Sequence, residues 1–257
     1  MKLRYITCSD PREHNSISSI FKLAHMPHAE IAVQCHPSKM SDGMPRNVWF
    51  NQLLRESAQL SKPINLAIHI NSEWANDICV NGHIPEIILE WIKLKRHNKP
   101  LIKRIQINMP KQTAIDFNPD YVAAIISWEF PKQEFIFQYN DNTKDAIEKL
   151  HRTQVPFSLL FDASGGRGVA PKEWQKPIYE SHPMGYSGGM SPDNVIGNLR
   201  NINQLVSGDS AIWIDAEGKL KDQTYDLFGE KPQFNVDLAR AYVRRANIWR
   251  NQNIKQK

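Results

Sequence analysis

Two segments of the sequence carry side chains that could do chemistry, and each follows a short apolar run. Asp162 closes the run that begins at Leu159, and the glycine-rich residues 165–168 come directly after it. Further along the chain, Gly188 and Gly189 close a second run. A strand that ends in a carboxylate can present a proton donor, and a glycine turn before a helix can hold a phosphate. Together the two segments predict an enzyme that acts on a sugar phosphate.

Asp162 and Cys8 are the candidate proton-transfer groups. Partial burial at the end of an apolar strand raises the pKa of a carboxyl group, so Asp162 could serve as a general acid. Cys8 follows the first apolar run, where a helix start or a cationic side chain would lower its thiol pKa enough for a general base. The alternatives are that Asp162 caps its own loop through backbone N–H groups and that Cys8 is an inert core residue.

The second segment could bind an anion. Glycine at 188 and 189 would let the backbone N–H groups approach an oxyanion closely, and the helix predicted from residue 192 would direct its positive end toward it. Gly218 and Lys219 follow a later apolar run and would complete the phosphate site. The alternative is an ordinary strand-to-helix turn, which also uses glycine.

These residues must be positioned by short β-rich apolar runs that alternate with segments of helical period. The eight predicted strands cover residues 4–7, 30–34, 64–70, 102–108, 134–139, 157–162, 184–187 and 211–215. The eight predicted helices cover residues 16–25, 48–60, 85–96, 119–127, 143–152, 171–179, 192–206 and 236–249. Strict alternation without a reversal of winding favours a closed barrel over a doubly wound sheet. We therefore predict a single α/β domain, a (β/α)8 TIM barrel with parallel strands and outer helices, over residues 1–250. Residues 251–257 are predicted to form a basic C-terminal tail.

The composition is that of a globular protein, with 41% hydrophobic and 23% charged residues among 257. No apolar stretch approaches the length needed to cross a bilayer, so we expect a cytoplasmic protein with no membrane partner. The three cysteines, Cys8, Cys35 and Cys79, show no CxxC spacing and are odd in number. We therefore expect reduced thiols.

The net charge of +5 would attract an anionic metabolite. Weak affinity for nucleic acid would also fit this charge, but no basic-aromatic module accompanies it, so no nucleic-acid partner is expected. The histidines and cysteines show neither HxxxH nor CxxC spacing, and no metal site is predicted. The expected partner is a small phosphorylated sugar, and the chain is expected to be a monomer or a homodimer.

These motifs resemble those of phosphoribosylanthranilate isomerase, the (β/α)8 enzyme of tryptophan biosynthesis. The early matches are Cys8 after the first strand, residues 45–48 with Arg46 after the second, and Gln106 in the fourth. The later and more specific matches are residues 160–162 with 165–168 and Trp174, residues 188–195, and residues 215–218 with 221–222. Their order and spacing agree with the family along nearly the whole predicted barrel.

The resemblance implies an Amadori rearrangement of N-(5-phosphoribosyl)anthranilate to 1-(o-carboxyphenylamino)-1-deoxyribulose 5-phosphate. Asp162 would protonate the furanose oxygen, Cys8 as thiolate would remove the C2 proton, and Arg46 could pair with the anthranilate carboxylate. Gln106, as the counterpart of the family's strand-four residue, joins Gly188, Gly189, Gly218 and Lys219 among the predicted substrate-binding residues. No metal or organic cofactor is needed, because the iminium formed from the substrate serves as the electron sink.

Four positions depart from the family pattern. They are Ile6 for lysine, Ser9 for glycine, Asn108 for histidine and Glu217 for serine. A carboxylate at 217 would repel a bound phosphate unless Lys219 or Lys221 compensates it. Two alternatives therefore stay open: an isomerase or lyase for another phosphorylated sugar, and a non-catalytic relative that binds a phosphosugar.

Overall fold

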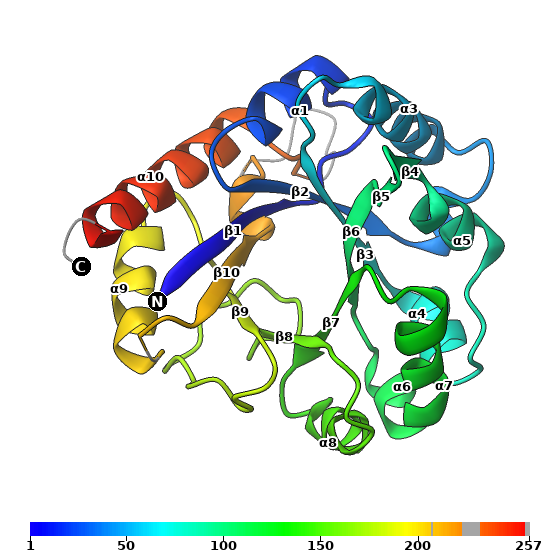
Figure 1. The fold of residues 1–257 in the computed structure, drawn as a ribbon. Helices are drawn as coiled ribbons and strands as arrows, with labels where there is room; N and C mark the ends of the chain where they lie inside the picture. Colours follow the sequence, from blue (N-terminus) through cyan, green and yellow to red (C-terminus); the bar gives the residue numbers. More distant parts are fainter. Residues whose placement is uncertain (207, 223–231, 255–257) are drawn as a thin grey trace. The chain divides into compact units, whose positions relative to one another are not determined.

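The computed structural model of the chain describes residues 1–206, 208–222 and 232–254. Within them, eight strands join in the order β1-β10-β9-β8-β7-β6-β3-β2 and close into a barrel (Figure 1). The strands are β1 (Lys2–Ser9), β2 (Ala29–Cys35), β3 (Asn65–Ile70), β6 (Ile102–Ile107), β7 (Glu134–Tyr139), β8 (Ser158–Phe161), β9 (Met184–Ser187) and β10 (Ala211–Ala216). The predicted parallel TIM barrel and all eight predicted strands are confirmed.

The helices of the described residues fall into two compact units of the chain. The first unit comprises Met1–Ala32 and Phe161–Lys257, and the second comprises Val33–Leu160. Helices of the first unit are α1 (Ile17–Ala24), α9 (Val195–Leu205), the 3₁₀ turn η2 (Gly218–Leu220) and α10 (Val236–Ile254). Helices of the second are α2 (Pro37–Met40), α3 (Pro45–Gln59), α4 (Ser72–Cys79), α5 (Glu86–Lys93), α6 (Lys111–Ile115), α7 (Pro119–Ala124), the π-helix η1 (Ile125–Glu129) and α8 (Lys144–Arg152).

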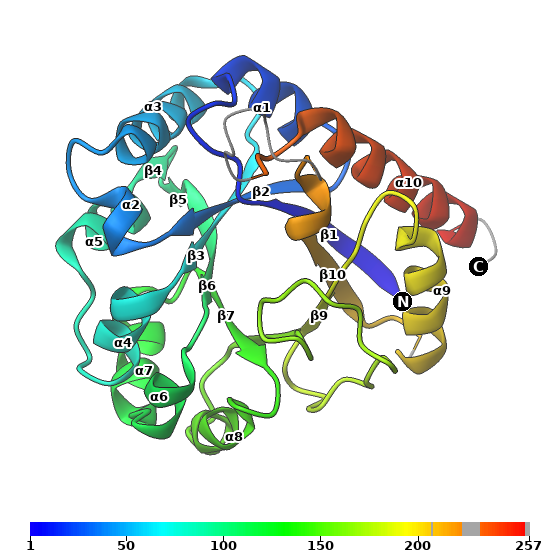
Figure 2. The ribbon, with the colours of Figure 1, turned by 180° about the vertical axis from the view of Figure 1, so that it is seen from behind.

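In the first unit, β1 pairs with β10 on one side and with β2 on the other. Figures 1 and 2 both show α10 alongside α9, and α10 also contacts α1 and β1. Capping explains where α1 begins, because Ser16 accepts a hydrogen bond from the Ser19 N–H through its side chain.

The strands of the first unit have one polar and one apolar face. Register partners on parallel strands share a face, and successive residues alternate between faces. The polar face carries Thr7, Ser9, Glu30, Ser187 and Asp215, all of them buried. The apolar face carries Ile6, Cys8, Ile31, Ile214 and Ala216. Hydroxyl groups satisfy the buried acids of the polar face, since Thr7 donates to Glu30 at 2.8 Å and Ser9 to Asp215 at 2.6 Å.

A glycine on β9 makes room for the largest side chain of β10. The indole of Trp213 is 1% exposed. A Cβ atom added at Gly185 would lie 2.1 Å from that ring. The absence of a side chain at 185 therefore allows the tryptophan to fill this part of the core.

In the second unit, β3, β6 and β7 run parallel and share the same alternation. One face carries buried polar residues, among them His69 paired with Gln106. The Arg104 guanidinium lies 3.3 Å from the Glu134 carboxylate on the next strand. The opposite face is apolar, and aromatic rings of the covering helices pack edge to face, as Phe50 and Trp91 do at 5.0 Å between centroids.

The helix predicted over residues 171–179 is wrong. The described chain between β8 and β9 is irregular, and Pro177, inside the predicted helix, lacks the N–H that the helical hydrogen-bond pattern needs. Aromatic packing orders this segment instead, because the Trp174 ring lies 6.2 Å from Phe161 and 5.8 Å from Tyr186. The Tyr186 hydroxyl also donates to the Gln175 carbonyl at 3.0 Å.

The structure contains several short elements that were not predicted, and its last helix is longer than predicted. Helices α2, α4 and α6 and the hairpin of β4 (Lys95–Arg96) and β5 (Lys99–Pro100) were not predicted from the sequence. Helix α10 continues to Ile254, so the described part of the predicted tail is helical, and residues 255–257 lie outside the described chain. Among the residues that the structure describes, no helix is long and apolar enough to cross a membrane.

Candidate functional site

Asp162 lies directly after β8 and is held by its own loop. Its Oδ1 accepts hydrogen bonds from the Ser164 N–H at 3.1 Å and the Ser164 hydroxyl at 2.8 Å. Its Oδ2 accepts from the Gly166 N–H at 2.7 Å. Residue 166 has a φ of +87°, a backbone conformation that favours glycine. The carboxylate therefore makes the loop-capping contacts that the sequence left open as an alternative, and these contacts fix its orientation.

The loop after Asp162 lies against Gly188 and Gly189. A Cβ atom at Gly188 would be 2.9 Å from the Val169 carbonyl oxygen, and one at Gly189 would be 2.9 Å from that of Gly168. The two glycines have φ values of +120° and +60°. We call residues 165–170 and 188–189 the glycine junction. Only glycine fits the second part of it, so the loop of the predicted acid packs directly against the predicted anion loop.

Helix α9 begins beside the glycine junction, at Val195 rather than at the predicted residue 192. Asn194 precedes it and accepts from the Ser191 N–H at 2.8 Å. The Asn194 side-chain amide also donates to the Gly189 carbonyl at 2.9 Å. The helix start is thus tied to the glycine turn, and the helix dipole gives this end a partial positive charge.

Gly218 and Lys219 lie on the 3₁₀ turn that follows β10, and both are exposed. A Cβ atom at Gly218 would meet nothing within 4 Å, so the space beside this backbone is open. The Glu217 carboxylate, which the sequence predicts to repel a phosphate unless a lysine compensates it, is paired with Lys221. Lys221 Nζ lies 2.9 Å from Glu217 Oε1.

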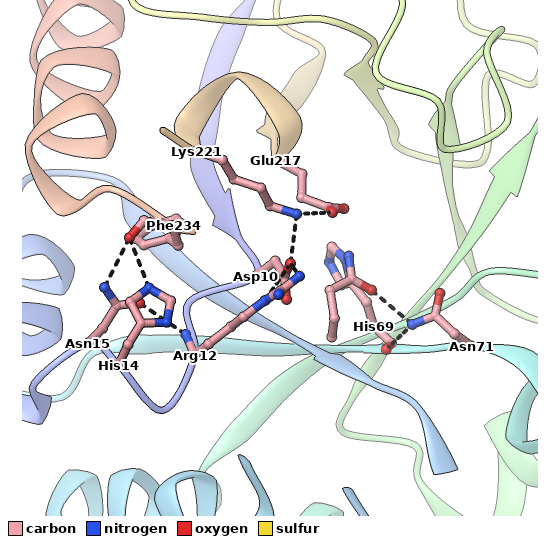
Figure 3. A network of polar contacts seen from close by, with 10 residues as sticks. Asp10, Arg12, His14, Asn15, His69, Asn71, Glu217, Lys221 and Phe234 are labelled. Carbon is pink, nitrogen blue, oxygen red and sulfur yellow. Dashed lines mark hydrogen bonds and ion pairs between the residues drawn. The ribbon is translucent and has the colours of Figure 1, made fainter. Parts of the chain in front are cut away.

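Lys221 also contacts a carboxylate at the end of β1 (Figure 3). Its Nζ lies 2.8 Å from Asp10 Oδ2, and Arg12 Nε donates to the same oxygen at 3.0 Å. Burial would raise the pKa of Asp10, but the Arg12 hydrogen bond and the Lys221 charge outweigh it and lower that pKa. Burial would lower the pKa of Lys221, but the charges of Glu217 and Asp10 raise it. Asp10 and Lys221 are therefore both charged at neutral pH.

The loop after β1 also holds the chain that leads into α10. In Figure 3 the side chains of His14 and Asn15 both point to the Phe234 carbonyl, at 3.2 and 3.0 Å. The Arg12 N–H donates to Asn15 Oδ1 at 3.0 Å, which orients that amide. The loop carrying Asp10 is thus held by Lys221 through Asp10 and by the Phe234 carbonyl through His14 and Asn15.

Cys8 has surroundings opposite to those that a general base needs. It is 0% exposed and lies on the apolar face, in register with Ile31 and Ala216. Burial raises the pKa of its thiol well above the ordinary value, and the charges of Asp215 and Glu30 raise it further. The predicted lowering of this pKa is wrong. The Cys8 side chain lies among core residues, which agrees with the alternative interpretation of Cys8 as an inert core residue.

Arg46 and Gln106 belong to the second unit. Arg46 is the second residue of α3 and is buried, and its charge opposes the rise that burial causes in the pKa of Cys35. Gln106 donates from Nε2 to Asn108 Oδ1 at 2.8 Å, and Asn108 donates to Asn71 Oδ1 at 2.9 Å. The residue that replaces the family's histidine thus orients the predicted binding amide.

The amide chain continues beyond Asn71. The Asn71 side chain donates to Gln34 Oε1 and to the His69 carbonyl, both at 2.8 Å (Figure 3). Gln34 Nε2 in turn lies 3.2 Å from His69 Nδ1. The His69 carbonyl can only accept, so the Asn71 atom that contacts it must be the Nδ2 donor. This assignment sets the orientation of every side-chain amide in the series Gln106, Asn108, Asn71 and Gln34.

Sequence reasoning missed Asp10 and Arg12, and it noted Asp215 within a motif after the last strand without giving it a role. The available signal was their position, since Asp10 directly follows β1 and Asp215 stands at the end of β10. Among residues 1–206, 208–222 and 232–254, no three His, Cys, Asp or Glu side chains are grouped so as to hold a metal ion.

Comparison with known proteins gives a similarity of fold. No family model and no curated protein matches the sequence. TrpF from Jonesia denitrificans superposes with a TM-score of 0.52 at 12% identity, covering 95% of this chain and 96% of its own. Phosphoribosyl anthranilate isomerase from Thermotoga maritima gives 0.46 at 10% identity, covering 94% and 98%. The YdjI aldolase from Escherichia coli K12 gives 0.45 at 13% identity, covering 98% and 90%. In fold, the chain is a TIM barrel similar to that of TrpF from Jonesia denitrificans.

Proposed function

We propose that the chain is an isomerase of a phosphorylated sugar and that N-(5-phosphoribosyl)anthranilate is its substrate. The observation that carries this proposal is the glycine junction, in which the loop of Asp162 lies against Gly188 and Gly189 so closely that a Cβ atom fits at neither glycine. Because β8 and β9 are neighbouring strands, Asp162 and the proposed backbone anion site follow adjacent strand ends. The motif resemblance supports the choice of substrate.

The phosphate would bind to backbone N–H groups of Gly188 and Gly189, beside the start of α9. The open space at Gly218 and the exposed ammonium of Lys219 offer a second side of the anion site. Such a site uses backbone dipoles and one mobile cation, as phosphate sites of TIM barrels commonly do after the last two strands. The observed compensation of Glu217 by Lys221 removes the main electrostatic objection to it.

Asp162 is the proposed general acid, which protonates the furanose oxygen while the C1–O bond breaks. Its fixed orientation matches that role, because proton transfer requires a positioned donor. We assign the removal of the C2 proton to Asp215 rather than to Cys8. Asp215 lies on the polar face at the end of β10, where Ser9 donates to it at 2.6 Å, whereas the Cys8 thiol is buried with a raised pKa.

The test is turnover of N-(5-phosphoribosyl)anthranilate by the wild type and by Asp162→Asn, Asp215→Asn and Cys8→Ser. We expect Asp162→Asn and Asp215→Asn each to lose about 10²- to 10⁴-fold in kcat, as is typical of acid–base groups. Cys8→Ser should keep kcat within about threefold, because its thiol takes no part. Undiminished turnover in both carboxylate variants would remove the proposed acid and base.

A second candidate is a non-catalytic protein that binds a phosphosugar at the same glycine junction. The burial of Cys8 favours it, because the family's base is then not available. Thermal-shift measurements, read together with the turnover assay, separate this candidate from the enzyme. Stabilisation by ribulose 5-phosphate without turnover of phosphoribosylanthranilate supports binding alone, and stabilisation by sugar phosphates without any response to anthranilate analogues supports an enzyme for another phosphosugar.

A further inference from the structure

Lys221 joins the loops that follow two neighbouring strands of the first unit. Its ammonium lies 2.8 Å from Asp10, directly after β1, and 2.9 Å from Glu217, directly after β10 (Figure 3). The side chain of Lys221 is 15% exposed, and that of Asp10 is 3% exposed. Water therefore screens this contact much less than it screens a surface pair.

The contact between Glu217 and Lys221 spans the turn that carries the proposed anion site. Residues 217 and 221 flank η2, so their ion pair closes over Gly218 and Lys219. Beyond the turn, Lys221 forms a bridge with Phe234, and the Asn235 N–H donates to the Leu220 carbonyl at 2.8 Å. The shape of the turn is thus fixed at both ends.

The same ammonium controls the charge beside the turn. The Glu217 carboxylate is 41% exposed and lies one residue before Gly218. Without a partner, its negative charge would oppose any anion bound there. Arg12 also binds Asp10, so Asp10 keeps a cation when Lys221 is removed. Lys221 also donates a hydrogen bond to Glu217 at 2.9 Å, so its removal takes positive charge away from the carboxylate beside Gly218.

We propose that Lys221 is a positioning residue for anion binding at Gly218 and Lys219: it neutralises Glu217 and holds η2 to the loop after β1 without touching the anion. This inference rests on the proposed function, because it needs an anion at that turn. It differs from the family pattern, in which serine stands at the position of Glu217.

The experiment measures binding of inorganic phosphate by isothermal titration calorimetry, at low salt, to the wild type and five variants. They are Lys221→Met, Lys221→Arg, Glu217→Gln, the double variant Lys221→Met with Glu217→Gln, and Lys2→Met. Lys2 lies 3.7 Å from Asp209 at the other end of β1 and is exposed, so its loss changes the net charge equally, away from the turn.

Lys221→Met should weaken phosphate binding on the order of tenfold, while Lys2→Met should leave it within about twofold. Lys221→Arg keeps the charge and should retain most of the affinity. The double variant should recover most of the loss, because it also removes the carboxylate whose charge Lys221 opposes; a role in folding alone would not be rescued in this way.

Other results of this experiment would contradict the proposed function, the inference about Lys221, or both. If the wild type binds no phosphate, both the proposed function and this inference fail. If the wild type binds but Lys221→Met binds equally well, or the double variant recovers nothing, the inference fails alone. Where Lys221→Met does not fold, Glu217→Gln decides: it should tighten phosphate binding by about two- to fivefold, and unchanged affinity overturns the inference.

Discussion

Cys8 on β1 and Tyr242 on α10 are both fully buried, and the charge interaction between them contributes to the raised pKa of the tyrosine. Burial is the larger cause for both groups. Because α10 packs against β1 and Cys8 lies on the apolar face of that strand, the thiol lies in the layer between strand and helix. The position explains why a cysteine that matches the family's catalytic residue in sequence has the properties of a core residue.

Folded protein should therefore protect its thiols. Cys8, Cys35 and Cys79 are all buried with raised pKa values, so a thiol reagent near neutral pH should react slowly with the native chain and quickly in denaturant. Reaction can be followed by mass spectrometry with assignment of the modified peptide. Rapid labelling of Cys8 in the native protein would show that the thiol is accessible and would reopen its role as a base.

Cys8→Ser should cost stability. A hydroxyl is harder to bury than a thiol among apolar core residues, so we expect a loss of about 1–3 kcal/mol in the free energy of unfolding. Urea unfolding of the wild type, Cys8→Ser and Cys8→Ala checks this. Alanine removes the polarity, so a serine variant more stable than the alanine variant would contradict the apolar surroundings.

Gly188→Ala should disrupt the glycine junction. The φ of +120° is strained for alanine, and its Cβ atom would lie 2.9 Å from the Val169 carbonyl oxygen. We expect a loss of about 1–3 kcal/mol and a weaker response to phosphate. Gly197→Ala is the matched control, because residue 197 is exposed within α9 and has nothing within 4 Å of a Cβ atom. That variant should gain about 0.5–1 kcal/mol. Equal stability of the two variants, measured in urea, would argue against the close packing.

Asp10 should contribute stability that depends on pH. Its pKa is lower in the folded state than in the unfolded state, so its contribution is present above the unfolded value of about 3.9. The contribution is lost as the pH falls through the lower, folded value. Asp10→Asn should therefore lose about 2 kcal/mol relative to the wild type at neutral pH, and this difference should shrink below about pH 4. A difference that stays constant across the acid range would contradict the ion pairs with Lys221 and Arg12.

The strands could be predicted because each is a short apolar run with turn residues at its ends, and buried parallel strands give that signal strongly. The segment at 171–179 shows the limit of the method. Its order comes from the packing of Trp174 on Phe161 and Tyr186, and period alone does not show that such contacts replace helical hydrogen bonds.

The candidate site was predicted less completely. The strand-end rule placed Asp162 and the glycines correctly along the chain. It failed for Cys8, because position along a strand does not give the face, although the alternation of Ile6 and Cys8 with Thr7 and Ser9 carries that information. The contact of Asp10 with Lys221 could not be predicted, since the two are distant in sequence and meet only through strand order.

The fit of Trp213 against Gly185 links two positions of the barrel in their evolution. Any side chain at 185 collides with the indole, and a smaller residue at 213 leaves a void unless 185 gains atoms. Neither residue 185 nor residue 213 can be substituted alone without a clash or a void, so in homologues we expect substitutions at these two positions to occur together. Such paired exchange would mark descendants of this barrel even where the residues around the anion site have diverged.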